Sequence, residues 1–332
     1  MKKQIVFTAL VALLAFTSST ISAQESDLGA LREKALKRIG VLPAQMPGAE
    51  NDTKLKQQLG EKLYFDVRLS KDDTISCNSC HLVDNNRAGD DGLPVSPGVG
   101  GVNGVRNSPT VLNAGFQSVQ FWDGRAPDLK EQAKGPILNP VEMAMPDEKS
   151  VEDKISAIAE YQDMFKEVYP EEKNPITFDN IVDSIAAYER TLITKDRFDD
   201  FLKGENDALT EQELRGLNLF FTKGCDLCHN GPVLGGKGFY KWSPAKQYPD
   251  KVDLGRYDAT KKDSDKYKFR VPMLRNVAIT APYFHDGKIS KLEDAVDWMG
   301  YMRSKTGLTD KEKEDISAFL KTLTGKERSK SR

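Results

Sequence analysis

The sequence has 332 residues, of which 39% are hydrophobic and 30% are charged. This composition is typical of a soluble globular protein, and the length allows about two domains. The formal net charge is −2 at pH 7, close to neutral. Proteins that bind nucleic acids or anionic membranes usually carry a strong positive charge, so neither is expected as a partner.

Residues 1–23 have the features of a secretory signal peptide. Lys2 and Lys3 precede an almost entirely apolar run over residues 5–16, and a small polar stretch then ends at Ala23, where we expect cleavage. The alternative is a membrane anchor, but a spanning helix needs about 20 apolar residues and this run is shorter. We therefore predict an exported, periplasmic protein whose mature chain has no membrane span.

Helical periodicity recurs along the rest of the chain, whereas the alternating pattern of strands does not. Thr210 opens the run T-E-Q-E, and Thr309 with Asp310 opens another, so both positions are expected to cap helices. Long segments rich in Gly, Pro and Asn, over residues 87–113, 231–253 and 271–287, are expected to be loops. We predict a mainly α fold with little or no sheet and with helices over residues 31–39, 53–65, 151–168, 178–192, 210–222 and 311–323.

The cysteines point to a cofactor. All four lie in two copies of the pattern C-x-x-C-H, made by Cys77, Cys80 and His81 and by Cys225, Cys228 and His229. Two thiols about one helical turn apart can reach the two vinyl groups of a porphyrin, and the following histidine can then bind its iron. The sequence therefore predicts two covalently attached haem c groups.

A disulfide or a zinc site would be the other interpretation of these cysteines. Disulfides do not explain why a histidine follows each pair, and a four-cysteine zinc site would need two distant pairs to meet. The two motifs divide the chain, which predicts haem domains over residues 24–193 and 194–325. The basic tail, residues 326–332, lacks a hydrophobic period and is expected to be a frayed, solvated end.

Only three histidines occur in the whole chain. Two of them belong to the haem motifs, which leaves His285 as the third. At most one haem can therefore have two histidine ligands, and the other needs a different sixth ligand or has none.

Several further segments carry a resemblance. They are N-S-P-T-V-L-N-A from Asn107, Q-F-W-D-G-R from Gln120, F-R-V-P from Phe269, L-R-N-V-A from Leu274, P-Y-F-H from Pro282 and W-M-G from Trp298. Together with the haem motifs, these segments resemble the bacterial di-haem cytochrome c peroxidases. The match runs in the family's order over roughly residues 30–325 and is more specific than the haem motifs alone.

The resemblance implies two α-rich, cytochrome c-like domains with haems that face a shared interface. It implies that the C-terminal haem accepts electrons and that the N-terminal haem reduces hydrogen peroxide to water. The implied electron donors are a small soluble cytochrome c or a cupredoxin. Family members commonly form homodimers, and no interface can be predicted from this sequence.

The resemblance also assigns roles to individual residues. It implies that Met299 is the sixth ligand of the second haem, with Met273 and Met302 as the nearest rivals; a thioether ligand raises the potential of iron. It implies that Glu142 and Gln132 lie over the peroxidatic haem, where a carboxylate can move a proton between the two peroxide oxygens.

Other implied positions lie between the haems. Trp122 matches the family's aromatic residue there, and His285 is expected to be a hydrogen-bonding residue at the domain interface. Arg270 is expected to pair with a haem propionate. By resemblance, Asn107, Thr280 and Pro282 would hold a calcium ion through oxygen ligands.

The sequence departs from the family at one functional position. Many members carry a Gly-His-Gly loop whose histidine blocks the peroxidatic iron in the oxidised state. Here Val99 takes its place, and valine cannot bind iron. We therefore expect the first haem to be five-coordinate or water-bound when oxidised and to need no ligand switch, unless Met143 or Met145 caps it or His285 swings across.

Two other functions remain open from the sequence. The first is a di-haem electron carrier without turnover, which Glu142 and Gln132 argue against. The second is a relative of the enzymes that mature tryptophan-derived quinone cofactors. Those enzymes have a tyrosine as the sixth ligand where this chain has Met299, although Tyr301 is two residues away.

Overall fold

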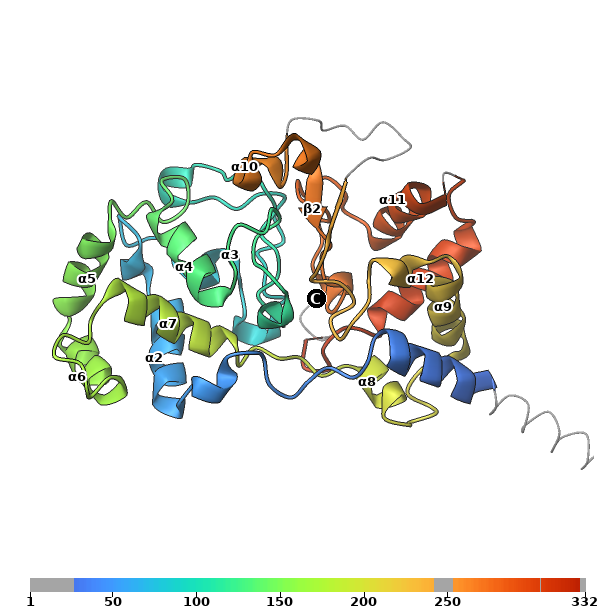
Figure 1. Cartoon of the computed structure of the whole chain (residues 1–332), viewed down its shortest axis with the longest axis horizontal. Coiled ribbons are helices and arrows are strands. Elements are labelled where there is room, and N and C mark those ends of the chain that lie inside the picture. Colours follow the sequence, from blue (N-terminus) through green and yellow to red (C-terminus); the bar gives the residue numbers. More distant parts are fainter. Residues whose placement is uncertain (1–26, 242–252, 305, 329–332) are drawn as a thin grey trace, which may run out of the picture.

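The computed structural model describes residues 27–241, 253–304 and 306–328, and the predicted signal peptide lies outside them. The chain folds into helices joined by long irregular loops, which confirms the predicted mainly α fold (Figure 1). The helices are residues 27–38, α2 (Lys54–Tyr64), α3 (Cys77–Cys80), α4 (Leu129–Leu138), α5 (Glu148–Ser156), α6 (Ala159–Val168), α7 (Phe178–Glu189), α8 (Arg197–Leu202), α9 (Glu211–Thr222), α10 (Tyr257–Thr260), α11 (Leu292–Ser304) and α12 (Asp310–Lys321).

The hydrophobic side chains form two large cores, one in each lobe of the molecule. The first core is built mainly by α2, α4, α5, α6 and α7, and the second by α8, α9, α11 and α12. The first helix, residues 27–38, packs into the second core through Ala35, and Ile39 follows it there. The chain then crosses to the other lobe before α2 begins, so the N-terminal segment ties the two lobes together (Figure 1).

Each core contains a helix pair that crosses at a glycine. On α2, a Cβ atom at Gly60 would lie 1.8 Å from the carbonyl oxygen of Ser184 on α7. On α9, a Cβ atom at Gly216 would lie 1.9 Å from the carbonyl oxygen of Asp315 on α12. Only glycine permits such a close approach of two backbones. The two lobes therefore repeat the same packing device although their sequences show no repeat beyond the haem motifs.

Replacing Gly60 with alanine is expected to destabilise the haem-loaded protein by about 1–3 kcal/mol, because the added methyl group overpacks the α2–α7 crossing. Gly29 is the matched control. It lies exposed in the first helix, with nothing within 4 Å of a built Cβ atom, so Gly29→Ala should be neutral or stabilising by up to about 1 kcal/mol. Denaturation midpoints measure both effects, and equal stability of the two variants would contradict this account of the crossing.

The predicted helix boundaries hold best where caps are strong. Thr210 and Thr309 cap α9 and α12, and each forms a reciprocal capping box with the glutamate three residues later, Glu213 and Glu312. Thr53 likewise caps α2 by accepting a hydrogen bond from the Lys56 amide at 3.2 Å.

The single helix predicted over residues 151–168 is wrong, because two helices occupy this range. α5 ends at Ser156, Ile158 has an extended backbone, and α6 begins at Ala159. Val151 on α5 and Phe165 on α6 both pack in the first core. The hydrophobic periodicity therefore continues across the break between the two helices, and the break cannot be predicted from it. The prediction also missed α4, α8, α10 and α11.

A small sheet and the loops around it join the lobes. β1 (Phe239–Lys241) pairs antiparallel with β2 (Lys268–Arg270), in a register that sets Phe239 opposite Arg270. The amide of Arg270 also donates to the carbonyl of Trp122 at 2.8 Å, which connects this sheet to the first lobe.

The prediction of a frayed tail is wrong for residues 326–328. Lys326 forms an ion pair with Asp200 at 2.5 Å, and Arg328 donates to the carbonyls of Val83 and Arg87 at 2.8 and 2.7 Å. Residues 326–328 thus contact both lobes. The segment is held by ion pairs and hydrogen bonds of its basic side chains, and hydrophobic periodicity cannot predict such contacts. Residues 329–332 lie outside the described residues.

Candidate functional site

The first C-x-x-C-H motif forms one tight turn of helix. α3 spans Cys77–Cys80, the amide of Ser76 donates to Ser79 Oγ at 3.0 Å, and the amide of His81 donates to the carbonyl of Cys77 at 3.0 Å. The carbonyl of His81 accepts a hydrogen bond from the Tyr64 hydroxyl at 2.6 Å. These bonds fix both thiols and the imidazole relative to one another.

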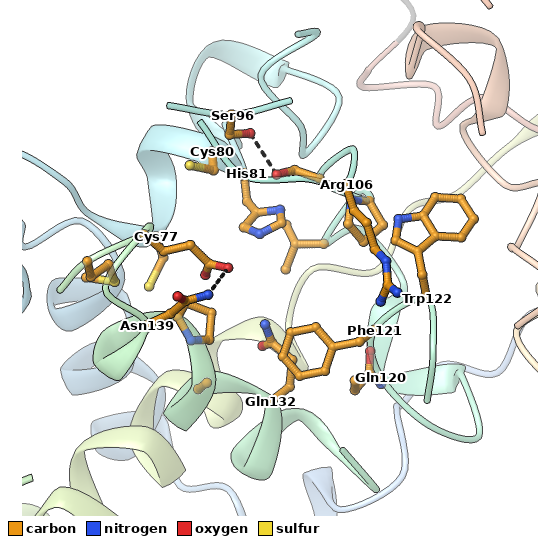
Figure 2. Close-up of a pocket in the computed structure, with 18 of the residues that line it drawn as sticks. Cys77, Cys80, His81, Ser96, Arg106, Gln120, Phe121, Trp122, Gln132 and Asn139 are labelled. Atoms are coloured by element: carbon orange, nitrogen blue, oxygen red, sulfur yellow. Dashed lines mark hydrogen bonds between the residues drawn. The ribbon is translucent and has the colours of Figure 1, made fainter. Parts of the chain in front are cut away.

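The motif opens onto a cavity of about 370 Å³. This size falls within the range of about 300–1,000 Å³ that is usual for ligand and cofactor sites. Figure 2 shows Cys77 and His81 on one wall, Gln132 and Phe121 across the space, and Trp122 at its far edge. The cavity brings together eight residues predicted from the sequence: Cys77, Cys80, His81, Asn107, Trp122, Gln132, Glu142 and Arg270.

The donors in this cavity fit a haem c group. The two thiols are free and can form thioethers, and burial lowers the pKa of His81, so its ring is neutral and offers a nitrogen lone pair to a metal. Apolar walls such as Ile137 and Ile185 complete the cavity.

Glu142 is held in the cavity wall by its neighbours. Its Oε1 accepts a hydrogen bond from Asn139 Nδ2 at 2.8 Å, and its carbonyl accepts one from the Val99 amide at 2.8 Å. Burial raises the pKa of Glu142, although the bond from Asn139 and the charge of Arg125 partly oppose this shift. The carboxyl group is therefore poised for proton transfer at a higher pH than an exposed glutamate.

The loop that contains Val99 is packed tightly against Glu142. A Cβ atom at Gly98 would lie 2.2 Å from the carbonyl oxygen of Val141 and 2.6 Å from that of Glu142. Gly98 lines the cavity, and Val99 is half-buried beside it. This close contact positions the two segments relative to each other.

Arg270 is a buried cation in the cavity wall. It is 2% exposed, and its guanidinium donates to the side chain of Gln117 and to the carbonyl of Phe121 at 3.1 Å. Burial lowers its pKa to about 10, and no carboxylate among the described residues forms an ion pair with it. A buried cation of this kind favours an anionic partner in the cavity.

Aromatic side chains cross the interface between the lobes. Trp122 Nε1 donates to the carbonyl of Asn107 at 2.9 Å, and its ring lies edge-on to His285 at 6.4 Å. His285 is 4% exposed and stacks on Phe269 at 4.1 Å. His285 thus lies at the interface and is absent from the lining of the cavity.

The three residues implied for calcium are distributed over two neighbouring loops. The amide of Asn107 donates to the carbonyl of His285 at 2.8 Å, which joins its loop to the segment of Thr280 and Pro282. The side-chain amide of Asn107 donates to the carbonyls of Leu93 and Pro94 at 2.9 and 3.3 Å. Among the described residues, no group of three or more His, Cys, Asp or Glu side chains could hold a metal.

The second motif has the same local form. Gly224 has a φ of 74°, a short turn spans Cys225–Leu227, and the amide of His229 donates to the carbonyl of Cys225 at 2.9 Å. The carbonyl of Leu234 lies 3.2 Å from His229 Nδ1 and can only accept, so Nδ1 carries the proton. Burial lowers the pKa of His229 to about 4, which leaves Nε2 unprotonated and suited to bind iron.

Met299 lies on α11, whose last turn packs against Gly224, the residue before the second motif. The side chain of Arg303 lies so close to Gly224 that a Cβ atom there would be 2.9 Å from its Nε. Met299 precedes Arg303 by four residues and shares its helical face, because residues four apart lie above one another. The rival Met273 instead packs with Leu42 and Val233 in a small separate cluster.

Three cavity residues were missed in the sequence. Asn139 donates a hydrogen bond to the Glu142 carboxylate, and its position three residues before Glu142 in N-P-V-E could have indicated this contact. Arg106 forms ion pairs with Asp123 and with Asp253 in the other lobe, which no local pattern reveals. Glu189 lies four residues after Ile185, so it is a charged residue on the apolar face of a helix.

The fold and the two motifs define a mainly helical c-type haem protein with two attachment sites, one of which opens onto a cavity with an acid and an amide. The family model described as di-haem cytochrome c peroxidase matches residues 54–207. A cytochrome c551 peroxidase of Pseudomonas aeruginosa is 45% identical, covering 90% of this chain and 87% of the relative. One of Nitrosomonas europaea is 42% identical, covering 92% and 91%.

Among solved structures, a MauG-like protein associated with microbial copper homeostasis is similar, with a TM-score of 0.77 and 31% identity over 86% of this chain and 94% of that one. The chain therefore belongs to the di-haem cytochrome c peroxidase family. It is an enzyme of the peroxidase class with two haem groups. Within the described residues, no helix is both long and apolar enough to cross a membrane.

Proposed function

We propose that this enzyme reduces hydrogen peroxide to water with electrons from a small soluble cytochrome c or cupredoxin. The observation that carries the proposal is the cavity that Glu142 and Gln132 line together with Cys77, Cys80 and His81. Gln132 lies across the space from His81 (Figure 2). A plain electron carrier has no need of an open cavity with a general acid–base group in it.

The chain's own residues supply the proton chemistry. The first haem, attached to Cys77 and Cys80 and bound by His81, would supply electrons to the peroxide bond. Glu142 takes the proton from the inner peroxide oxygen and returns it to the outer oxygen, which leaves as water. Gln132 orients the peroxide through its side-chain amide. Asn139 keeps the Glu142 carboxyl turned toward the cavity.

Electrons arrive through the second lobe. We assign the second haem to Cys225, Cys228 and His229, with Met299 as its sixth ligand. Trp122 lies between the lobes, at the edge of the first cavity and against the ring of His285, and is placed to support electron transfer. Residues 24–193 and 194–325 then form the peroxidatic and the electron-accepting domains.

Two further groups complete the proposed site. Arg270 pairs with a propionate of the first haem, which gives the buried guanidinium the anion that it lacks among the described residues. A calcium ion binds between the loops of Asn107 and of Thr280 and Pro282, where their backbones are hydrogen-bonded together.

The first haem needs no activation by a ligand switch. Val99 stands where many family members have a blocking histidine, and valine has no atom that can bind iron. Its loop is fixed to Glu142 by a hydrogen bond of 2.8 Å. We also propose that the protein acts in the periplasm after removal of residues 1–23, which lie outside the described residues.

The test is oxidation of a reduced small cytochrome c, and separately of a reduced cupredoxin, by hydrogen peroxide with catalytic amounts of the haem-loaded protein. We expect two donor molecules to be oxidised for each peroxide consumed. If both haems are loaded and reducible but peroxide drives no donor oxidation, the protein is an electron carrier and the proposal is wrong.

A further inference from the structure

A network of ion pairs joins the two lobes beside Trp122 and has no part in the mechanism above. Arg106 and Trp122 lie at the same edge of the cavity (Figure 2). The Arg106 guanidinium donates to Asp123 Oδ2 in the first lobe at 2.7 Å. It also donates to both carboxylate oxygens of Asp253 in the second lobe, at 2.6 and 2.7 Å. A single cation thus bridges one carboxylate from each lobe.

The three charges of this bridge are largely shielded from solvent. The side chains of Arg106, Asp123 and Asp253 are 15%, 4% and 17% exposed, so salt and water screen their attraction only weakly. Burial lowers the pKa of Arg106, but the hydrogen bonds that Asp253 and Asp123 accept from it outweigh burial and raise this pKa. Burial likewise raises the pKa of Asp253, and the hydrogen bonds from Arg106 and from the Gly255 amide reverse that shift. Removing one partner would therefore leave the other as a mostly buried charge without its bidentate contact.

The same arginine is connected to the aromatic rings between the lobes. Its neighbour Asn107 accepts a hydrogen bond from Trp122 Nε1 at 2.9 Å, and the Asn107 amide donates to the carbonyl of His285 at 2.8 Å. The Arg106 guanidinium lies 5.9 Å from the ring centre of Phe269, which stacks on His285. His285 in turn meets Trp122 edge-on. These contacts form a closed ring, so a shift of Arg106 displaces Trp122 relative to His285.

We propose that Arg106 is a positioning residue whose ion pair with Asp253 across the lobes holds Trp122 in place for electron transfer between the haems. The inference rests on the proposed function, in which electrons pass from the second lobe to the first. Each electron leaves the ferrous second haem, which becomes ferric, and enters the first-haem site after peroxide has oxidised that site. Two such electrons and two protons convert one peroxide to two water molecules.

The test follows the second haem through a single turnover. The haem-loaded protein is pre-reduced by one electron, so that the second haem is ferrous and the first is ferric, and is mixed with enough peroxide that the rate no longer rises. Arg106→Gln should slow the oxidation of the second haem by about 10–10²-fold, the loss that a displacement of about 1 Å can cause in a preorganised site. The potential of the second haem should not change, which separates positioning from a change in driving force.

Asp253→Asn removes the other half of the pair and leaves Arg106 bound to Asp123. It should slow the same step. The double variant should be no slower than Arg106→Gln alone, because two residues that act through one contact do not contribute additively. An unchanged rate in either single variant, or losses that multiply in the double variant, would overturn the inference.

Arg190→Gln is the matched control, because it breaks an ion pair of the same kind within the first lobe. Arg190 donates to both carboxylate oxygens of Asp52, at 2.5 and 2.8 Å, and both side chains are buried. This variant should lose stability but retain the rate at which the second haem is oxidised. If Arg190→Gln slows that step as much as Arg106→Gln, general destabilisation explains the effect and the inference is wrong.

Hydrogen exchange at the Asn107 amide makes the test independent of peroxide. This amide donates to the carbonyl of His285, so its exchange should become faster in Arg106→Gln and in Asp253→Asn but not in Arg190→Gln. Unaltered exchange in Asp253→Asn would refute the inference even if Arg106→Gln failed to fold. If the variants show the expected exchange but peroxide does not oxidise the second haem of the wild-type protein, the proposed function is refuted and the positioning of Trp122 by Arg106 is not.

Discussion

Glu142→Gln is expected to lower peroxide turnover by about 10²–10⁴-fold, the usual contribution of a positioned general acid–base group. Glutamine keeps the shape of the side chain and can still interact with Asn139, but it cannot accept a proton. Because the haem motif is untouched, the spectra and potential of the second haem should not change. The measurement is steady-state peroxide consumption by the haem-loaded variant.

The pH profile separates this role from a structural one. The carboxylate is the form that accepts a proton, and burial raises the pKa of Glu142. Turnover of the wild-type enzyme should therefore fall as the pH drops through this raised pKa, and the residual activity of Glu142→Gln should lack that acid limb. Glu131→Gln is the control, because Glu131 is exposed on α4 and pairs with Lys134 at the surface. Equal losses in the two variants would contradict the assignment.

Met299→His is expected to produce the second large effect, a lower potential of the second haem. Histidine stabilises ferric iron relative to a thioether ligand, and axial ligands span a range of about 0.8 V in haem proteins. Each drop of about 59 mV makes electron uptake tenfold less favourable. A shift of about 0.2 V would thus reduce electron acceptance by about 10³-fold and slow turnover accordingly.

Two other methionines provide controls for Met299. Met302→Leu changes the same helix and Met273→Leu removes the buried rival, and both should retain the absorption of a methionine-ligated haem. The measurement is a redox titration followed by visible and near-infrared spectra. Loss of the methionine signature in either control, with retention in Met299→His, would show that the ligand was assigned to the wrong residue.

The sequence was most informative where chemistry depends on neighbouring residues. The haem motifs need only consecutive residues, and capping boxes such as the one at Thr210 are local too. The break at Ile158 escaped notice because the apolar face continues on both sides of it. α4 was missed because Gly135 and Pro136 lie inside it and obscure its period.

The site, too, divides into residues that the sequence identifies and contacts between distant segments that only the structure shows. Resemblance supplied Glu142 and Gln132, and the structure adds that they share one cavity with His81. The helix of residues 27–38 packs into the core of the second lobe, and Arg106 in the first lobe pairs with Asp253 in the second. Both contacts join segments that are far apart in the chain, so no local sequence pattern could predict them. Glu189 has a plain local signature, a charge on an apolar helix face, but its significance depends on the cavity that it enters.

The measurement that tests the central claim most directly is peroxide turnover by the haem-loaded protein, started from the fully oxidised state and again after one-electron pre-reduction. An open first haem, as Val99 predicts, should give the same initial rate from both starts. Turnover only after pre-reduction would mean that another group blocks the first haem and would contradict this account of its activation. No turnover from either start would contradict the peroxidase function itself.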